Sequence, residues 1–178
     1  MGSGADPTPV AVALGSNLGD RAGSLRAALH ALTGVLTHLR ASTFHETAPV
    51  GVGEQPMFLN AAAVGLTSLA PQELMVALLR IERDLGRERP HPGAARVIDL
   101  DLILFGNRIV TSGPVSIPHP RFRDRLFVLE PLCEVAPDWV DGQLEEGFAM
   151  RKLSSYLRQP QLSLAQAVST FKECFLGE

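Results

Sequence analysis

The sequence predicts an α+β protein: a ferredoxin-like two-layer α/β sandwich with an antiparallel sheet. Segments with apolar residues at helical spacing alternate with short apolar runs typical of buried strands. Their order is strand, helix, strand, strand, helix, strand, which is the split β-α-β arrangement. A length of 178 residues with 46% hydrophobic content suits one domain with a sizeable core. We expect the helices to cover one sheet face and leave the other free for a ligand.

The first third of the chain supplies a strand, a helix and a second strand. Residues 10–14 form a short apolar run that predicts a buried strand, ending at the turn Gly15-Ser-Asn-Leu-Gly-Asp20. Residues 40–47 predict the second strand. The helix between them carries one apolar stripe of leucines three or four residues apart, namely Leu25, Leu29, Leu32, Leu36 and Leu39.

A loop, a strand and a second helix follow. Residues 48–57 contain two glycines and two prolines, and such a loop between strands is a candidate binding segment. Residues 58–67 predict the third strand, with Phe58, Asn60, Ala62 and Val64 on one face. Asn60 is either a ligand-reading amide or a turn-bonding asparagine. Pro71 begins the second helix, which Gly86 ends.

The fourth strand lies in Arg96-Val-Ile-Asp-Leu-Asp-Leu-Ile-Leu-Phe105. Asp99 and Asp101 then share a face with Ile103 and Phe105, and the opposite, core-facing side carries Ile98, Leu100, Leu102 and Leu104. Two adjacent carboxylates repel each other unless a cation lies between them. Mg²⁺ typically takes one or two protein carboxylates and completes its shell with water and substrate phosphates. The alternative is a solvated strand face that carries two charges.

Arginines flank the acidic pair in the sequence, and this pattern favours a polyphosphate site. The alternative for the excess of arginine is a simple compositional bias. All but two of the 16 basic residues are arginine, and those nearest the pair are Arg80, Arg83, Arg87, Arg89, Arg96, Arg121, Arg123 and Arg125. No Walker-A or protein-kinase motif is present. His119, between two prolines, is either a phosphate contact or a histidine that packs in a turn.

The chain ends and the overall charge complete the predictions. We expect residues 1–9 to be a disordered tail, residues 10–152 to be the domain, and residues 153–178 to be a helical extension packed on it. A net charge of −3 gives no sign of nucleic-acid or membrane binding. The sequence contains no secretory signal and no apolar run of membrane-spanning length, so we expect a cytoplasmic protein. We also expect a monomer.

The motifs together resemble those of 6-hydroxymethyl-7,8-dihydropterin pyrophosphokinase, the folate-pathway enzyme that transfers pyrophosphate from ATP to a pterin alcohol. The likeness runs from about Val10 to Trp139. The motifs that carry it are Gly15-Ser-Asn-Leu-Gly19, Glu46-Thr-Ala-Pro-Val-Gly51, Gln55-Pro-Met-Phe-Leu-Asn-Ala61, Ser68-Leu-Ala-Pro71, Arg96-Val-Ile-Asp-Leu-Asp-Leu102, Ile117-Pro-His-Pro-Arg121 and Arg125-Leu-Phe-Val-Leu129. The family's fold is the sandwich predicted above.

The resemblance implies a role for each candidate residue. Asp99 and Asp101 would bind two Mg²⁺ ions, while Arg96 and Arg89 would stabilise the transferring group. Residues that would lie along ATP are Glu82, Arg87, Leu102, Ser116, His119 and Arg125. Residues that would read or stack on the pterin are Thr47, Pro49, Val50, Phe58, Asn60 and Phe127.

The loop before the acidic strand departs from the family pattern. Where the family has Arg-Trp-Gly-Pro-Arg-Thr, this loop is one residue shorter, reads Pro92-Gly-Ala-Ala-Arg-Val97 and keeps only Arg96. One alternative is therefore a weakly active or inactive paralogue that binds nucleotide or pterin. Another is an RNA-binding module on the same architecture, although the acidic pair and the negative net charge count against it.

Overall fold

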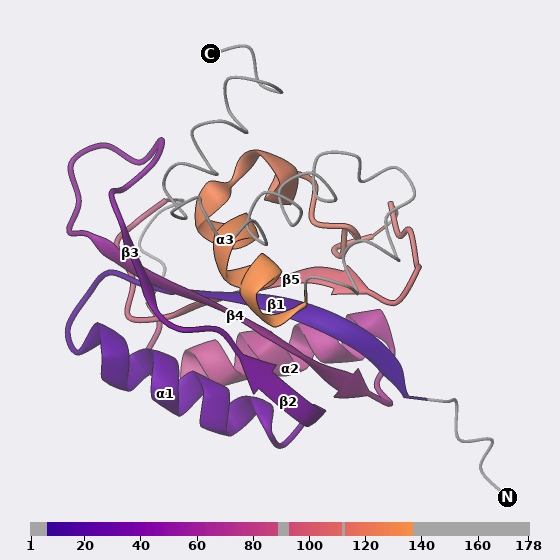
Figure 1. Cartoon of the computed structure of the whole chain (residues 1–178). Coiled ribbons are helices and arrows are strands. Elements are labelled where there is room, and N and C mark those ends of the chain that lie inside the picture. The colour runs from indigo at the N-terminus through magenta and orange to yellow at the C-terminus, as the bar shows by residue number, and fades with distance from the viewer. Residues whose placement is uncertain (1–6, 89–92, 112, 137–178) are drawn as a thin grey trace, which may run out of the picture.

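A computed structural model describes residues 7–88, 93–111 and 113–136, and a five-stranded antiparallel sheet is its centre (Figure 1). The strand order is β2-β4-β1-β5, and β3 pairs with β4 as well. The strands are β1 (Thr8–Ser16), β2 (Thr37–Ala41), β3 (His45–Thr47), β4 (Phe58–Thr67) and β5 (Asp99–Phe105). The described helices are α1 (Arg21–Leu32), α2 (Pro71–Asp84), the short 3-10 turn η1 (Phe122–Asp124) and α3 (Leu126–Val135). The predicted α+β class and split β-α-β order are confirmed.

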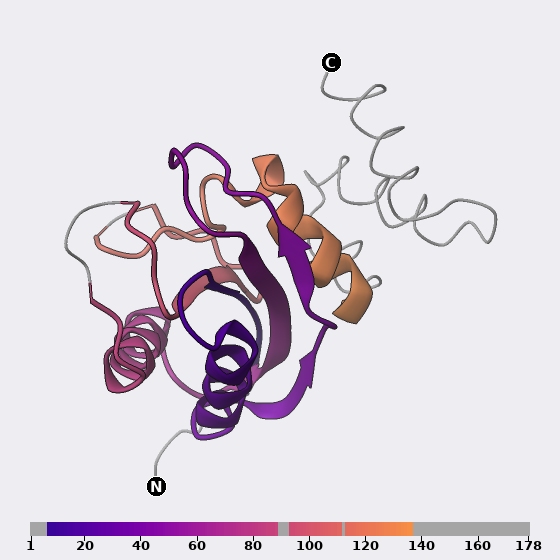
Figure 2. The same cartoon turned by 90° about the vertical axis from the view of Figure 1, so that its left-hand side faces the viewer.

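Helices α1 and α2 lie together on one face of the sheet (Figure 2). The Asp20 carboxylate begins α1 by accepting a hydrogen bond from the Gly23 N–H at 2.9 Å. Glu73 accepts one from the Ala70 N–H at 2.7 Å, beside Pro71 at the first helical position of α2. The core that these helices form with the sheet includes Val12, Leu14, Leu25, Leu32, Leu74, Leu78, Leu100 and Leu102.

Helix α3 packs on the other face, so the prediction that this face is free was wrong (Figure 2). It covers a second core that contains Ala11, Ala62, Val64 and Ile103. The helix was missed because it contains Pro131 and is apolar on most of its surface. Among the described residues, α3 leaves a ligand access to this face at its end beyond the second core.

A bulge in β5 changes the predicted alternation of its last residues. The pairing register with β1 shifts, so that Leu102 lies opposite Val12 and Leu104 opposite Ala11. Leu104 therefore packs under α3, and Phe105 packs on the side of α1 and α2. The predicted faces were right up to Ile103 and wrong for Leu104 and Phe105.

Two other boundaries differ from the prediction. Helix α1 ends at Leu32, and Leu36 enters the same core from the following turn, where its N–H donates to the Leu32 carbonyl at 2.8 Å. The second strand is divided into β2 and β3, because the Ser42 hydroxyl accepts a hydrogen bond from the Ala62 N–H at 3.0 Å between them. The predicted leucine stripe is therefore one packed surface, formed by α1 and the segment after it and not by a single helix.

The ends of the chain test only part of the domain prediction. Strand β1 begins at Thr8, so Thr8 and Pro9 belong to the sheet and not to a tail. The predicted helical extension at 153–178, the domain end at 152 and the candidate Arg89 lie outside the described residues. Within the part of the chain that the structure describes, the helices are too short or too polar to cross a membrane.

Candidate functional site

The free end of the sheet face brings three neighbouring strands together. Gly15 of β1 lies opposite Asn60 of β4 on one side and opposite Asp99 of β5 on the other. A Cβ atom at Gly15 would lie 3.2 Å from the Asn60 Oδ1, so only glycine leaves the amide undisturbed. The acidic pair and the candidate amide thus lie on one floor, separated by the width of a single strand.

Each oxygen of the Asp99 carboxylate faces an arginine. Arg87 Nη1 contacts Oδ1, and Arg96 Nε lies 3.1 Å from Oδ2. The same Arg87 nitrogen contacts Glu82, whose buried Oε1 also accepts a hydrogen bond from the Leu100 N–H at 2.7 Å. Two guanidinium groups therefore offset the repulsion expected between Asp99 and Asp101. One of them, that of Arg87, is also positioned by Glu82.

The charge of Asp101 is less well neutralised than that of Asp99. Arg125 Nη1 lies 3.6 Å from its Oδ2. Burial and, secondarily, the charge of Asp99 raise the pKa of Asp101 above its usual 3.8. Burial lowers the pKa of the neighbouring His119, despite the opposing effect of Asp101. The pair of carboxylates would thus gain from a bound cation.

The donor set fits a magnesium ion that is completed by substrate. Within residues 7–88, 93–111 and 113–136, no three His, Cys, Asp or Glu side chains converge as a metal-binding group. The metal ligands that the described residues offer here are thus the two carboxylates of Asp99 and Asp101. Carboxylate oxygens are hard ligands of the kind that Mg²⁺ accepts. Phosphate oxygens and water would have to fill the remaining positions.

Two arginines join the acidic pair to two aromatic rings. Arg96, which contacts Asp99, has its guanidinium carbon 5.5 Å from the centre of the Phe58 ring. Arg125, beside Asp101, lies in the same way 5.6 Å from the Phe127 ring. The acidic pair, these two arginines and the two phenylalanine rings therefore lie next to one another.

The candidate pterin-reading residues lie along β3, β4 and the loop after β3. The Asn60 amide is 4% exposed and donates a hydrogen bond to the Thr47 hydroxyl at 2.8 Å. Pro49 and Val50 follow Thr47 in the loop, where Pro49 is half-buried and Val50 is 70% exposed. The structure thus brings Asn60 and Thr47 into direct contact, while Val50 points to solvent.

The remaining nucleotide candidates lie near the outer edge of β5. The turn that contains Ser116 and His119 lies beside this strand, because the His119 N–H donates to the Ile103 carbonyl at 3.0 Å. The Leu102 side chain is 1% exposed and faces α1 and α2. Any ligand contact by Leu102 must therefore use its backbone, whose groups face the same edge as the Leu100 N–H bonded to Glu82.

Asn17 organises the loops around the site, and sequence reasoning missed this role. Its buried side chain donates to the Gln55 Oε1 at 3.0 Å and accepts from the Arg96 N–H at 2.8 Å. Gln55 in turn donates to the Gly93 carbonyl at 2.8 Å. The network fixes the backbone of Arg96 and joins loop 48–57 to residues 93–96. The sequence signal was only a turn-forming Asn, because the partners lie far away in the chain.

Comparisons with known proteins agree on one family. The family model for 7,8-dihydro-6-hydroxymethylpterin-pyrophosphokinase (HPPK) matches residues 11–137. The 2-amino-4-hydroxy-6-hydroxymethyldihydropteridine pyrophosphokinase of Bacillus subtilis is 43% identical over 126 residues, or 70% of this chain and 75% of that protein. A mitochondrial folate synthesis bifunctional protein of Arabidopsis thaliana is 44% identical over 134 residues, or 75% of this chain. The chain spans only 24% of that plant protein.

A solved structure shows the same fold. The crystal structure of a Plasmodium falciparum HPPK-DHPS triple mutant with pteroate superposes with a TM-score of 0.63 at 15% identity. The superposition covers 96% of this chain and 45% of that chain. Because the family model matches more than half of the sequence, the chain belongs to the 7,8-dihydro-6-hydroxymethylpterin-pyrophosphokinase family.

Proposed function

We propose that this chain transfers pyrophosphate from MgATP to the hydroxymethyl group of 6-hydroxymethyl-7,8-dihydropterin, giving AMP and the pterin diphosphate in folate biosynthesis. One observation carries the proposal. Arg96 lies between Asp99 and the Phe58 ring, and Arg125 lies in the same way between Asp101 and the Phe127 ring. Such a site can hold a polyphosphate on one side and a planar heterocycle on the other. Family membership supports the same reaction.

Asp99 and Asp101 would hold two Mg²⁺ ions in this reaction. Bound Mg²⁺ supplies charge neutralisation for the phosphates and makes the pterin alcohol more acidic. Because arginines occupy both oxygens of Asp99, one arginine must move to admit a cation. Arg96 is the one to move, since its side chain is 19% exposed, whereas the side chain of Arg87 is 7% exposed and contacts Glu82.

The reaction is an in-line attack of the pterin hydroxymethyl oxygen on the β-phosphorus of ATP, with AMP as leaving group. Arg96 and Arg89 neutralise charge that develops on the transferring phosphate oxygens. Arg125, His119 and Ser116 contact the nucleotide, Leu102 does so through its backbone, and Glu82 acts by holding Arg87. Asn60 and Thr47 read the pterin edge while Phe58 and Phe127 stack on its ring. Catalysis comes from positioning and electrostatics, without a covalent enzyme intermediate.

A coupled assay for AMP, with hydroxymethyl-dihydropterin and MgATP, tests this function. AMP formation that requires both the pterin and Mg²⁺ is the expected result. Tight binding of both substrates without AMP would identify an inactive paralogue and overturn the proposal. We further propose that the protein is a cytoplasmic monomer with no nucleic-acid or membrane partner, which light scattering and cell fractionation would test.

Asn60→Ala should weaken pterin binding by about 1–3 kcal/mol, because polar groups on the bound ligand and the Thr47 hydroxyl lose their partner. ATP-analogue binding should be unchanged. Isothermal titration with each ligand measures both effects, and Asn107→Ala in the exposed turn after β5 is the matched control. Equal losses for pterin and ATP would show that Asn60 has a structural role only.

Gly15→Ala should also weaken pterin binding, by about 1 kcal/mol, because the new methyl group must displace the Asn60 amide. The expected signature is a higher KM for pterin with little change in the KM for ATP. An unchanged pterin KM would mean that the exact position of the Asn60 amide has no effect on binding.

A further inference from the structure

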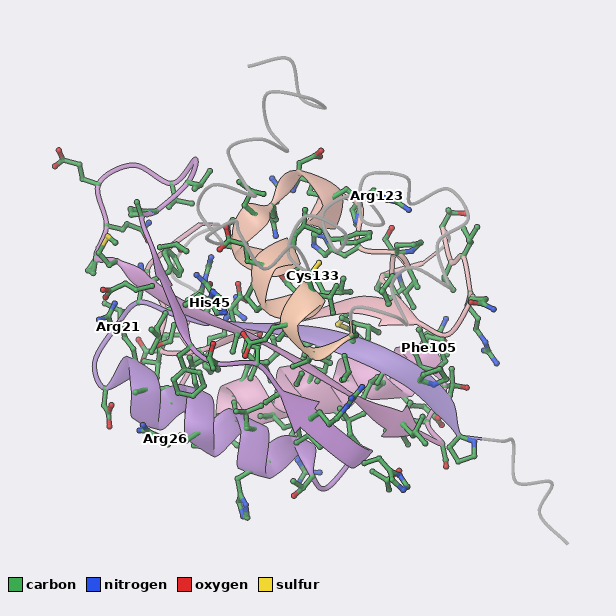
Figure 3. All side chains as sticks on the ribbon, viewed as in Figure 1. Arg21, Arg26, His45, Phe105, Arg123 and Cys133 are labelled. Carbon is green, nitrogen blue, oxygen red and sulfur yellow. The ribbon has the colours of Figure 1, made fainter. Side chains whose placement is uncertain are left out.

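A histidine and two carboxylates join β3 to α3 at a distance from the acidic pair. His45 of β3 lies beside α3 (Figure 3), with its Nε2 3.0 Å from Glu134 Oε2 and its Nδ1 3.9 Å from Glu130 Oε2. The two glutamates are one helical turn apart. Their side chains are 19% and 37% exposed for Glu130 and Glu134, and that of His45 is 15% exposed. The imidazole ring therefore lies between two partly buried carboxylates.

Thr43 completes the connection to Glu134. Its N–H donates to Oε1 at 2.8 Å and its hydroxyl donates to Oε2 at 2.9 Å. Burial alone would raise the pKa of Glu134, but the hydrogen bonds from His45 and Thr43 outweigh it and hold the pKa below its usual value. Glu134 is thus an ionised carboxylate held by three donors of segment 43–45.

The charges that face His45 come from α3. Strand β4, which pairs with β3, contains no titratable residue, and neither does the segment Ser42-Thr-Phe44. Glu46, the next residue of β3, pairs with Arg21 at 2.7 Å. Among the described residues, Glu130 and Glu134 are therefore the charged groups that pair with His45.

The connection spans the two walls of the proposed pterin site. Strand β3 continues from His45 to Thr47, which contacts the Asn60 amide. Helix α3 continues back from Glu130 to Phe127, whose ring lies next to Arg125. A change in the position of β3 against α3 would therefore alter the spacing between the residues that read the pterin edge and a ring that stacks on it.

We propose that His45 is a positioning residue that holds these two walls together for the pterin. The inference rests on the proposed function. The His45 ring lies between Glu130 and Glu134, and its Nε2 is within hydrogen-bond distance of Glu134, so removal of the ring would free β3 to shift against α3. Pterin affinity should therefore fall when the ring is removed, while ATP affinity should be unchanged.

The test is isothermal titration of the full chain with hydroxymethylpterin and, separately, with an ATP analogue. His45→Ala should lose about threefold to tenfold in pterin affinity relative to the parent. His45→Gln should recover part of this loss, because its amide can still donate a hydrogen bond to Glu134. His30→Gln on the exposed side of α1 should keep the affinities of the parent.

Each outcome of this test separates the inference from the proposed function. If the parent binds pterin and forms AMP but His45→Ala binds pterin as tightly as the parent, the role of His45 is wrong and the function stands. If His45→Ala shifts pterin and ATP affinity equally, the cluster is a general structural contact and the inference is overturned. If the parent neither binds pterin nor forms AMP, the proposed function fails first, and the inference fails with it.

Discussion

Asp99→Asn and Asp101→Asn should each lower turnover about a hundredfold to a thousandfold, yet shift the melting temperature in opposite directions. The loss of turnover follows because each amide removes an anionic ligand from the pair that would hold Mg²⁺. Asp99→Asn should lower the melting temperature, because Arg87 and Arg96 lose the carboxylate that they share. Asp101→Asn should raise it, because burial and the Asp99 charge disfavour ionised Asp101 in the fold.

The gain from Asp101→Asn should depend on pH in a defined direction. The folded pKa of Asp101 is raised above 3.8, so its ionisation costs stability at pH values above that folded pKa. The parent bears this cost at pH values above the folded pKa and loses it as the pH falls from the folded pKa to the unfolded value. Thermal melts without Mg²⁺ should show the two proteins converging in acid, and added MgATP should stabilise only the parent.

Asp124→Asn, at an exposed carboxylate in η1, is the control for this pair. It should leave turnover and melting close to those of the parent. Near-parent turnover in Asp99→Asn or Asp101→Asn would contradict the assignment of the carboxylates as metal ligands. Unchanged melting of Asp99→Asn would show instead that its arginine contacts contribute nothing to stability.

The sequence predicted those parts of the fold that follow from local periodicity. Alternation along β5 places Asp99 and Asp101 on one face, and the stripe in α2 places its apolar residues against the sheet. The bulge beyond Leu102 was not predictable, because Ile103, Leu104 and Phe105 are all apolar and suit either face. Helix α3 was not predicted for a related reason, because an apolar segment with an internal proline shows no helical periodicity.

The candidate site residues remain a prediction, and the structure adds the contacts that connect them. The acidic pair, Asn60 and the two phenylalanines came from strand pattern and family resemblance. The contacts of Asn17 and Glu82 came only from the structure, because each joins segments distant in the chain. The family resemblance predicts that Glu82 lies along ATP. In the fold its carboxylate contacts Arg87 and the Leu100 N–H of β5.

Arg87→Met should be the most destabilising of the substitutions considered, lowering the free energy of unfolding by about 3–5 kcal/mol. The side chains of Arg87 and Glu82 are only 7% and 3% exposed, and Arg87 contacts both Glu82 and Asp99. Removing the guanidinium leaves the buried Glu82 charge without this partner, and such a charge is costly. Urea denaturation at neutral pH measures the loss, and turnover should fall too because Asp99 loses one of its two anchors.

Two further variants show whether burial of charge causes the loss. Arg80→Met removes an exposed ion pair with Asp84, 3.7 Å long and 75% and 67% exposed, and should change stability by less than about 1 kcal/mol. The double variant Arg87→Met with Glu82→Gln should recover part of the stability, since glutamine still accepts from the Leu100 N–H without carrying a charge. It should not recover turnover, because Asp99 still lacks Arg87. Equal stability of Arg87→Met and Arg80→Met would contradict the structural role of Arg87. Arg96 and the strand would then be enough to position Asp99, and Arg87 could serve the phosphates of ATP instead.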